Sequence, residues 1–326
     1  MIIGHAKQLD FLRKSWEEKH ISHAYLFVGP HGVGKRLVAT ELAGWVLGKK
    51  EAPEDLAREF QICYVEREPN KKTGKKNKDI SIDQIHAVRN YLSHHSFLNN
   101  HKLVIIDEAE FMSRSAGNAL LKTLEEPAPQ STTILLADDE KRLLPTIVSR
   151  CQLLRFYPVA TTEIAEALKR LGVKKEEAEN LARLSHHRPG RALELWQETA
   201  ELEFYNTEAK KFFNLLDNSL GKRFKELSKF FGKSESGDHG DHIEKRDELV
   251  KVLNIWQGLW RDIMLCRSEA GELIDNASFA DKIKIQSQKR GARAMAKSIQ
   301  EIEEAKKLLH QNIHPRLIFE NLIVNF

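Results

Sequence analysis

The stretch Leu26-Phe-Val-Gly-Pro-His-Gly-Val-Gly-Lys-Arg36 decides the fold of this 326-residue chain. Its first residues are apolar and predict a short buried strand, and the apolar residues after Lys35 recur at helical spacing. Between them the glycines and the lysine follow the G-x-x-x-x-G-K spacing of a phosphate-binding loop, namely Gly29, Gly32, Gly34 and Lys35. Small residues let backbone N–H groups approach phosphates, and the helix N-terminus favours negative charge. A tight turn made by glycines alone leaves Lys35 unexplained, so we predict a phosphate-loop α/β fold.

Arg36 departs from this motif. The position normally holds a Ser or Thr whose hydroxyl binds Mg²⁺, and a guanidinium cannot ligate a metal. We therefore expect ATP, ADP or phosphate to bind here, if at all, without a firmly held Mg²⁺.

A second apolar strand is predicted at 102–106, and it ends in two adjacent carboxylates, Asp107 and Glu108. At the carboxyl end of a buried parallel strand, such acids lie beside a bound nucleotide. The first orients the Mg²⁺ shell and the second polarises the attacking water. Taken alone, the pair would be better explained as a solvated acidic turn, but the upstream loop favours the nucleotide site.

The composition limits the class of protein. The 51 Lys and Arg residues nearly balance 47 Asp and Glu residues, for a formal charge of +4, which argues against uniform coating of nucleic acid but leaves local basic patches open. Three isolated cysteines, Cys63, Cys151 and Cys266, lack C-x-x-C spacing and so argue against disulfides and an all-cysteine zinc site. With no apolar run of about 18 residues, we expect a cytoplasmic protein.

The rest of the chain predicts two or three domains. A helix at 115–126 and strands at 132–137 and 153–156 complete a first α/β domain, which Pro158 ends. Helical spacing dominates 159–203 and again 204–326, and a broad apolar stripe at 249–263 predicts helix-bundle core. A closing helix is expected from Pro315, which suits its first turn.

Two polar segments are predicted as loops. The segment 66–79 is rich in lysine, and a solvated loop is favoured over contact with a phosphate backbone. The segment 233–242 has low hydrophobicity and predicts a disordered linker, a more economical interpretation than metal binding by His239 and His242.

These features together resemble the clamp-loader branch of the AAA+ ATPases, over essentially the whole chain. The resemblance is carried by the loop above and by the segments Ile106-Asp-Glu-Ala-Glu110, Asn118-Ala-Leu-Leu-Lys-Thr-Leu-Glu-Glu-Pro127, Ser149-Arg-Cys151 and Pro315-Arg-Leu-Ile-Phe-Glu-Asn-Leu322. It implies a RecA-like domain at 1–158, a helical lid at 159–203 and a helical collar at 204–326. It also implies partners: gamma/tau and delta subunits of DNA polymerase III in a pentamer, the beta sliding clamp and primer–template DNA.

The resemblance gives Arg150 the role of an arginine finger that reaches the nucleotide site of a neighbouring subunit. A guanidinium there stabilises charge on the transferring phosphoryl group, worth about 10³- to 10⁵-fold in rate. The local alternative is that Arg150 pairs with a nearby carboxylate of its own chain.

The chain also departs from the family. Asp138 falls where active relatives place a neutral residue that senses the γ-phosphate, and its charge would repel a phosphate. Gly190 falls where they keep a sensing arginine, and Cys63 alone stands where relatives carry a four-cysteine zinc module, so we expect no zinc. We expect a clamp-loader subunit that assists ATP-dependent clamp loading without hydrolysing ATP itself. The alternatives are an active ATPase subunit of the same assembly and, more remotely, an independent phosphate-loop NTPase.

Overall fold

The computed structural model describes residues 2–49, 53, 55–69, 76–93, 101–231, 241–311 and 313–326. They form two compact units. Unit 1 comprises Met1–Ala178 with Ser185–Ala192, and unit 2 comprises Glu179–Leu184 with Leu193–Phe326. The division into three domains at 158 and 203 stays a prediction, and residue 203 lies inside helix α9 (Thr199–Asp217).

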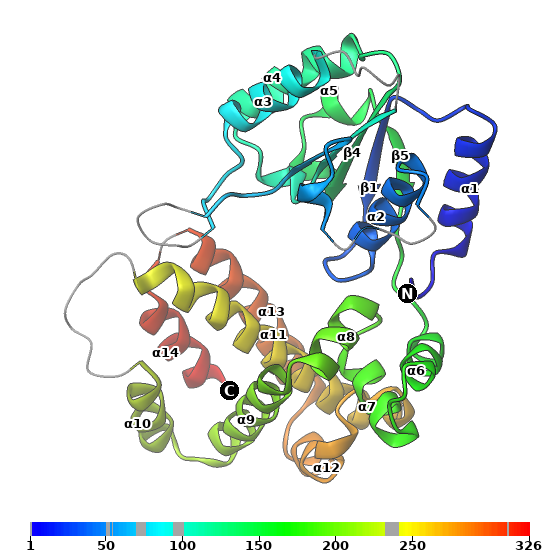
Figure 1. The fold of residues 1–326 in the computed structure, drawn as a ribbon. Coiled ribbons are helices and arrows are strands. Elements are labelled where there is room, and N and C mark those ends of the chain that lie inside the picture. The colour runs from blue at the N-terminus through cyan, green and yellow to red at the C-terminus, as the bar shows by residue number, and fades with distance from the viewer. Residues whose placement is uncertain are drawn as a thin grey trace. The chain divides into compact units, whose positions relative to one another are not determined.

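Unit 1 is built on a five-stranded sheet with the order β2-β3-β4-β1-β5 (Figure 1). Every neighbouring pair in this sheet is parallel. The strands are β1 (Ala24–Val28), β2 (Ile62–Val65), β3 (Lys102–Ile106), β4 (Ser131–Ala137) and β5 (Gln152–Arg155). The predicted α/β class with a parallel sheet is therefore confirmed, as are four of its strands, whereas β2 was not predicted.

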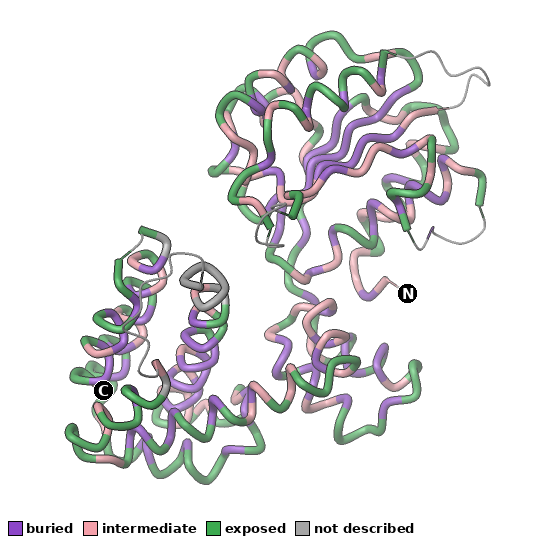
Figure 2. Tube along the Cα trace, turned by 60° about the vertical axis from the view of Figure 1, so that its left-hand side comes forward, coloured by how far each residue is buried: buried purple, intermediate pink, exposed green. Residues whose placement is uncertain are grey.

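Side chains of the sheet alternate between two apolar layers. In β1, Tyr25 and Phe27 pack in the layer with α1 (Ala6–Glu17) and α2 (Lys35–Val46). Leu26 and Val28 pack in the opposite layer, which the helices α3 (Ile82–Ser93), α4 (Arg114–Glu125) and α5 (Pro145–Val148) cover. Both faces are covered, and Figure 2 shows the strands buried along most of their length. This burial explains why the strands read as continuous apolar runs.

Local sequence fixes the ends of these helices. At the start of α3, Ser81 Oγ accepts from the Gln84 N–H at 3.3 Å and Gln84 Oε1 accepts from the Ser81 N–H at 3.0 Å, a reciprocal capping box. At the end of α2, Gly48 takes φ = 64°, a conformation that favours glycine. Short 3₁₀ helices occupy Leu56–Arg58, Ala109–Phe111, Glu140–Arg142, Gly271–Leu273 and Ala277–Phe279.

The remaining helices follow in chain order. They are α6 (Thr161–Arg170), α7 (Lys175–Leu184), α8 (Pro189–Gln197), α9, α10 (Leu220–Phe231), α11 (Asp241–Arg267), α12 (Ala280–Lys289), α13 (Ala292–His310) and α14 (Pro315–Asn325). The predicted stripe is confirmed as core, because all of its members on α11 are buried: Leu249, Leu253, Trp256, Trp260 and Ile263. Pro315 is the first residue of α14, as expected. Of the predicted linker, 233–240 lies outside the described residues, and 241–242 begin α11 instead.

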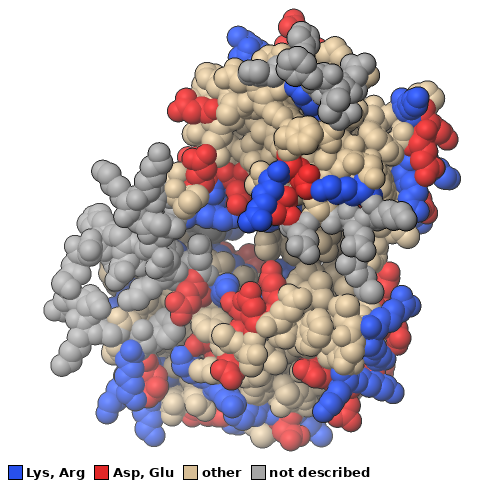
Figure 3. Space-filling view, viewed as in Figure 1, with Lys and Arg blue, Asp and Glu red and all other residues tan. Residues whose placement is uncertain are grey.

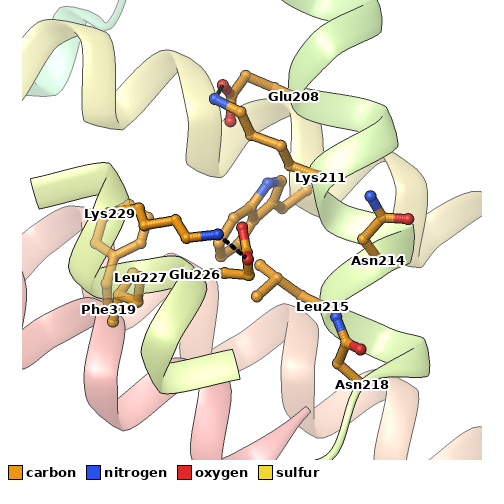
Figure 4. Close-up of a pocket in the computed structure, with 10 residues that line it drawn as sticks. Glu208, Lys211, Asn214, Leu215, Asn218, Glu226, Leu227, Lys229 and Phe319 are labelled. Atoms are coloured by element: carbon orange, nitrogen blue, oxygen red, sulfur yellow. Dashed lines mark hydrogen bonds and ion pairs between the residues drawn. The ribbon is translucent and has the colours of Figure 1, made fainter. Parts of the chain in front are cut away.

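A cavity of about 370 Å³ lies in unit 2 (Figure 4). The lining of this cavity includes the apolar Trp256 and Phe319 and also Lys211, which pairs with Glu208 at 2.6 Å. It contains none of the predicted site residues.

The surface carries both signs of charge. Figure 3 shows acidic and basic side chains interspersed over the face that it displays. Among the residues that the structure describes, no helix is both long and apolar enough to cross a membrane.

Candidate functional site

The predicted phosphate-binding loop lies at the carboxyl ends of three neighbouring strands. It connects the end of β1 to Lys35, the first residue of α2. Because β1 pairs with β4 and β4 pairs with β3, the residues that follow these strands meet at one edge of the sheet. The fold thus brings Lys35, Arg36, Asp107, Glu108 and Asp138 into one site.

The glycines of the loop are needed for different reasons. Gly32 and Gly34 have φ = 77° and 116°, backbone angles that residues with a Cβ rarely adopt. Gly29 has ordinary backbone angles but is buried, and a Cβ there would lie 2.3 Å from the backbone oxygen of Phe156. Close packing at the β1–β5 edge therefore demands Gly29, whether or not a phosphate binds.

Lys35 is turned into the protein and is only 8% exposed. Its Nζ donates to Asp138 Oδ1 at 2.8 Å, to the Pro30 oxygen at 3.2 Å and to the Gly29 oxygen. The lysine expected to reach terminal phosphates is thus held by its own chain, and Asp138 is its ion-pair partner.

Arg36 lies beside the first of the two predicted acids. Its Nη1 is 3.9 Å from Asp107 Oδ2, and its guanidinium stacks on the Tyr64 ring at 4.8 Å. The Tyr64 hydroxyl donates to the same carboxylate oxygen at 2.8 Å. Burial, reinforced by the negative charge of Asp107, raises the pKa of Tyr64, so the hydroxyl keeps its proton.

Glu108 is held by a second arginine. Arg67 donates from Nε to Oε2 and from Nη2 to Oε1, each at 2.8 Å, and Lys76 Nζ lies 3.5 Å from Oε2. The hydrogen bonds and charge of Arg67 lower the pKa of Glu108 against the opposing effect of burial. Glu108 has φ = 53°, so its carboxylate is presented from a left-handed backbone position. Both acids therefore have partners within the chain, Asp107 with Tyr64 and Arg36, and Glu108 with Arg67.

A turn at 185–192 of unit 1 lies directly on the loop. The Gly190 N–H donates to the Gly32 oxygen at 2.7 Å, and a Cβ on residue 190 would approach that oxygen to 2.8 Å. This backbone contact leaves no room for a side chain where active relatives are expected to keep an arginine. On another side, His5 Nε2 hydrogen-bonds the Val33 oxygen at 2.9 Å, and burial lowers the pKa of that imidazole.

Arg150 follows α5 and is paired within its own chain. Its Nη2 is 2.8 Å from Glu125 Oε1, and its Nη1 donates to the Thr146 oxygen at 3.0 Å. Glu125 is thus the nearby carboxylate of the same chain with which the alternative interpretation paired Arg150. The action of Arg150 on a neighbouring chain stays a prediction.

Sequence reasoning missed Tyr64 and Arg67, which come from β2 and the segment after it. No motif marks them, since they reach the site only through pairing of β2 with β3. In the predicted basic loop, Lys71, Lys72 and Lys75 lie outside the described residues, whereas Lys76 contacts Glu108.

The described residues offer no cluster of metal ligands. No group of three or more His, Cys, Asp or Glu side chains there could hold a metal ion, and Cys63, Cys151 and Cys266 are free thiols. The expected absence of zinc stays a prediction.

Comparison with known proteins identifies relatives. A family model described as "DNA polymerase III, delta subunit" matches residues 4–160. The delta-prime subunit of DNA polymerase III from Bacillus subtilis is 26% identical over 321 residues, which cover 97% of this chain and 94% of that subunit. The delta-prime subunit from Haemophilus influenzae is 41% identical over 123 residues, or 37% of either chain. Among solved structures, a gamma-subunit-related protein of Thermotoga maritima aligns over 97% of both chains with 19% identity and a TM-score of 0.42.

Proposed function

We infer that this chain, a delta-prime-like member of the clamp-loader branch of the AAA+ ATPases, is a clamp-loader subunit that does not hydrolyse ATP. One observation carries the second half of this inference. Every charged group expected to handle a nucleotide is already paired within the chain: Lys35 with Asp138, Arg36 with Asp107, and Glu108 with Arg67.

These residues do not fit a Mg²⁺–nucleotide. The hydroxyl ligand is replaced by Arg36, whose positive charge beside Asp107 repels a divalent cation. Both carboxylate oxygens of Glu108 already accept hydrogen bonds from Arg67, and the lowered pKa makes this carboxylate a weaker base toward a water molecule. The site therefore lacks both the metal position and the general base that phosphoryl transfer needs.

We further propose that Arg150 acts in trans, on the nucleotide of a neighbouring subunit. Its side chain is 36% exposed, so it is accessible at the surface of unit 1. An exposed ion pair such as that with Glu125 contributes only about 0–1 kcal/mol, so exchange of Glu125 for a phosphate costs little. The arginine would stabilise the charge of the transferring phosphoryl group.

We propose the partners that the resemblance to clamp loaders implies. They are gamma/tau and delta subunits in a pentamer, the beta sliding clamp and primer–template DNA, in the cytoplasm. The retention of Lys35, Asp107 and Glu108 favours a second candidate, an active ATPase subunit of the same loader. We rank it lower because all three side chains have internal partners.

Two measurements test the proposal. The purified chain is expected to show negligible Mg²⁺-dependent ATP turnover, and robust turnover that Lys35→Ala abolishes would establish the second candidate instead. In a loader reconstituted with its gamma/tau and delta subunits, Arg150→Ala is expected to lower ATP turnover at least tenfold.

Arg155→Ala is the matched control, since Arg155 is also partly exposed and paired, to Glu140 at 2.9 Å. It removes the same charge from the same unit and is expected to leave turnover unchanged. An equal effect of both variants, or no effect of Arg150→Ala, would remove the role assigned to Arg150.

A further inference from the structure

Lys35 has no hydrogen-bond donor left for a ligand. An ammonium group has three N–H donors. The acceptors that surround Nζ are also three, the Gly29 and Pro30 backbone oxygens and Asp138 Oδ1. A phosphate can therefore reach this lysine only by displacing one of them.

Asp138 is the partner that matters, because it alone carries charge. It directly follows β4, and Ala137 at the end of that strand accepts from the Gly29 N–H at 3.2 Å, so Asp138 is fixed next to the start of the loop. Its own N–H is held by Glu110 Oε1 at 3.1 Å. The backbone thus presents this carboxylate to Lys35 from a fixed position.

We propose that Asp138 serves as an internal substitute for phosphate at Lys35, and that its charge decides whether the loop accepts a polyphosphate group. With Asp138 ionised, the lysine is already neutralised and an arriving phosphate meets a negative charge. This deepens the proposed function by giving a reason for an unused loop, but it concerns the isolated chain and not Arg150.

The arrangement of Lys35 and Arg36 indicates which class of ligand would bind once the negative charge of Asp138 is removed. Asp138→Asn keeps the size of the side chain while leaving Lys35 with its full positive charge. Arg36 adds a second cation at the next position, and its side chain is 58% exposed. The gained site therefore takes an inorganic polyphosphate or the phosphate tail of a nucleotide. Because Arg36 stands where the motif has its Mg²⁺-binding hydroxyl, its positive charge takes the place of the metal, and binding does not require Mg²⁺.

The test is equilibrium binding of a fluorescent ATP analogue to the full-length chain, with tripolyphosphate as competitor and with either Mg²⁺ or EDTA present. Asp138→Asn is expected to bind at least tenfold more tightly than the wild type in both buffers, and tripolyphosphate is expected to compete. The double variant Asp138→Asn with Lys35→Ala is expected to lose this gain.

Asp139→Asn is the matched control. It removes one negative charge from the neighbouring residue, whose carboxylate accepts from the Lys141 N–H at 3.0 Å. It is expected to bind like the wild type. If Asp139→Asn raises the affinity for the ATP analogue equally, the effect comes from the change in net charge and not from the pairing with Lys35, which would overturn the proposal.

Two further outcomes would also overturn it: an Asp138→Asn variant that binds no more tightly than the wild type, and a gain that survives Lys35→Ala. Circular dichroism checks folding, and Asp138→Ser provides a second neutral variant. ATP turnover measured on the same samples keeps the two proposals apart, since turnover by the wild type contradicts the proposed function alone.

Discussion

Substitution of Gly29 by alanine tests whether this loop glycine serves packing or only phosphate approach. The added Cβ would lie 2.3 Å from the Phe156 backbone oxygen, about 1 Å closer than ordinary contact. Phe156 cannot withdraw freely, because its N–H donates to the Val28 oxygen at 2.7 Å. Gly29 is fixed in turn by its own hydrogen bond to Ala137. The clash therefore strains the attachment of β5 to β1.

The magnitude follows from these contacts. Overpacking lowers the free energy of unfolding by about 1–3 kcal/mol, and a weakened backbone hydrogen bond lowers it by about 1 kcal/mol more. Alanine also reduces the conformational entropy of the unfolded chain, which stabilises the protein by about 0.4–1 kcal/mol. We expect Gly29→Ala to lower the free energy of unfolding of unit 1 by about 2–3 kcal/mol. For a unit of this size that corresponds to a fall in Tm of about 4–12 °C.

Urea and thermal unfolding followed by circular dichroism measure this effect, without nucleotide. Gly221→Ala, in α10, is the control, because a Cβ there meets nothing within 4 Å. It is expected to raise stability by about 0.5–1 kcal/mol. If the Gly29→Ala protein is as stable as the wild type, packing does not require this glycine, and only the approach of a phosphate would explain it.

Two further predictions concern charged and polar pairs. Since Arg67 lowers the pKa of Glu108, the stability that the pair contributes is present above about pH 4.5, the ordinary value, and is lost as the pH falls through the lowered pKa. The excess unfolding free energy of the wild type over Glu108→Gln, measured by urea titration, should therefore shrink below that pH, and a constant difference would contradict the pairing. In unit 2, Asn276 is fully buried, accepts from the Tyr205 hydroxyl at 2.6 Å and donates to Asp262 at 2.8 Å. Asn276→Ala should cost about 2–4 kcal/mol in urea unfolding, and a cost below about 0.5 kcal/mol would show that the network contributes little.

The parts of the fold that the sequence predicted are those with local or periodic signals. Strands such as β1 and β4 are buried on both faces and so appear as apolar runs, and α14 is marked by Pro315. Strand β2 was missed because it is only four residues long, at the sheet edge, and partly exposed at Cys63 and Tyr64. Short strands of this kind carry too little pattern to be distinguished from a loop.

The candidate site divides in the same way. The loop and the acids after β3 were found because their residue types and spacing are set by chemistry. The pairing of Lys35 with Asp138 joins residues 103 positions apart, and sequence reasoning predicted only that Asp138 would repel a phosphate. Arg67 reached Glu108 without any motif, because nothing in its neighbourhood distinguishes it from a surface arginine. Both pairs form only through the tertiary structure, which sequence patterns do not reveal.

The position of β1 inside the sheet also has a consequence during synthesis of the chain. Both of its neighbours, β4 and β5, are made much later, and the last of them ends at Arg155. At about 5–20 residues per second, a ribosome needs about 6–25 s to proceed from Val28 to that point. Until β4 is complete at Ala137, Tyr25 to Val28, all buried in the native state, have no neighbouring strand with which to pair, and the second neighbour is complete only at Arg155. The nascent segment is thus a natural client for a chaperone that binds extended apolar peptide, and assembly of the sheet must wait for the C-terminal third of unit 1.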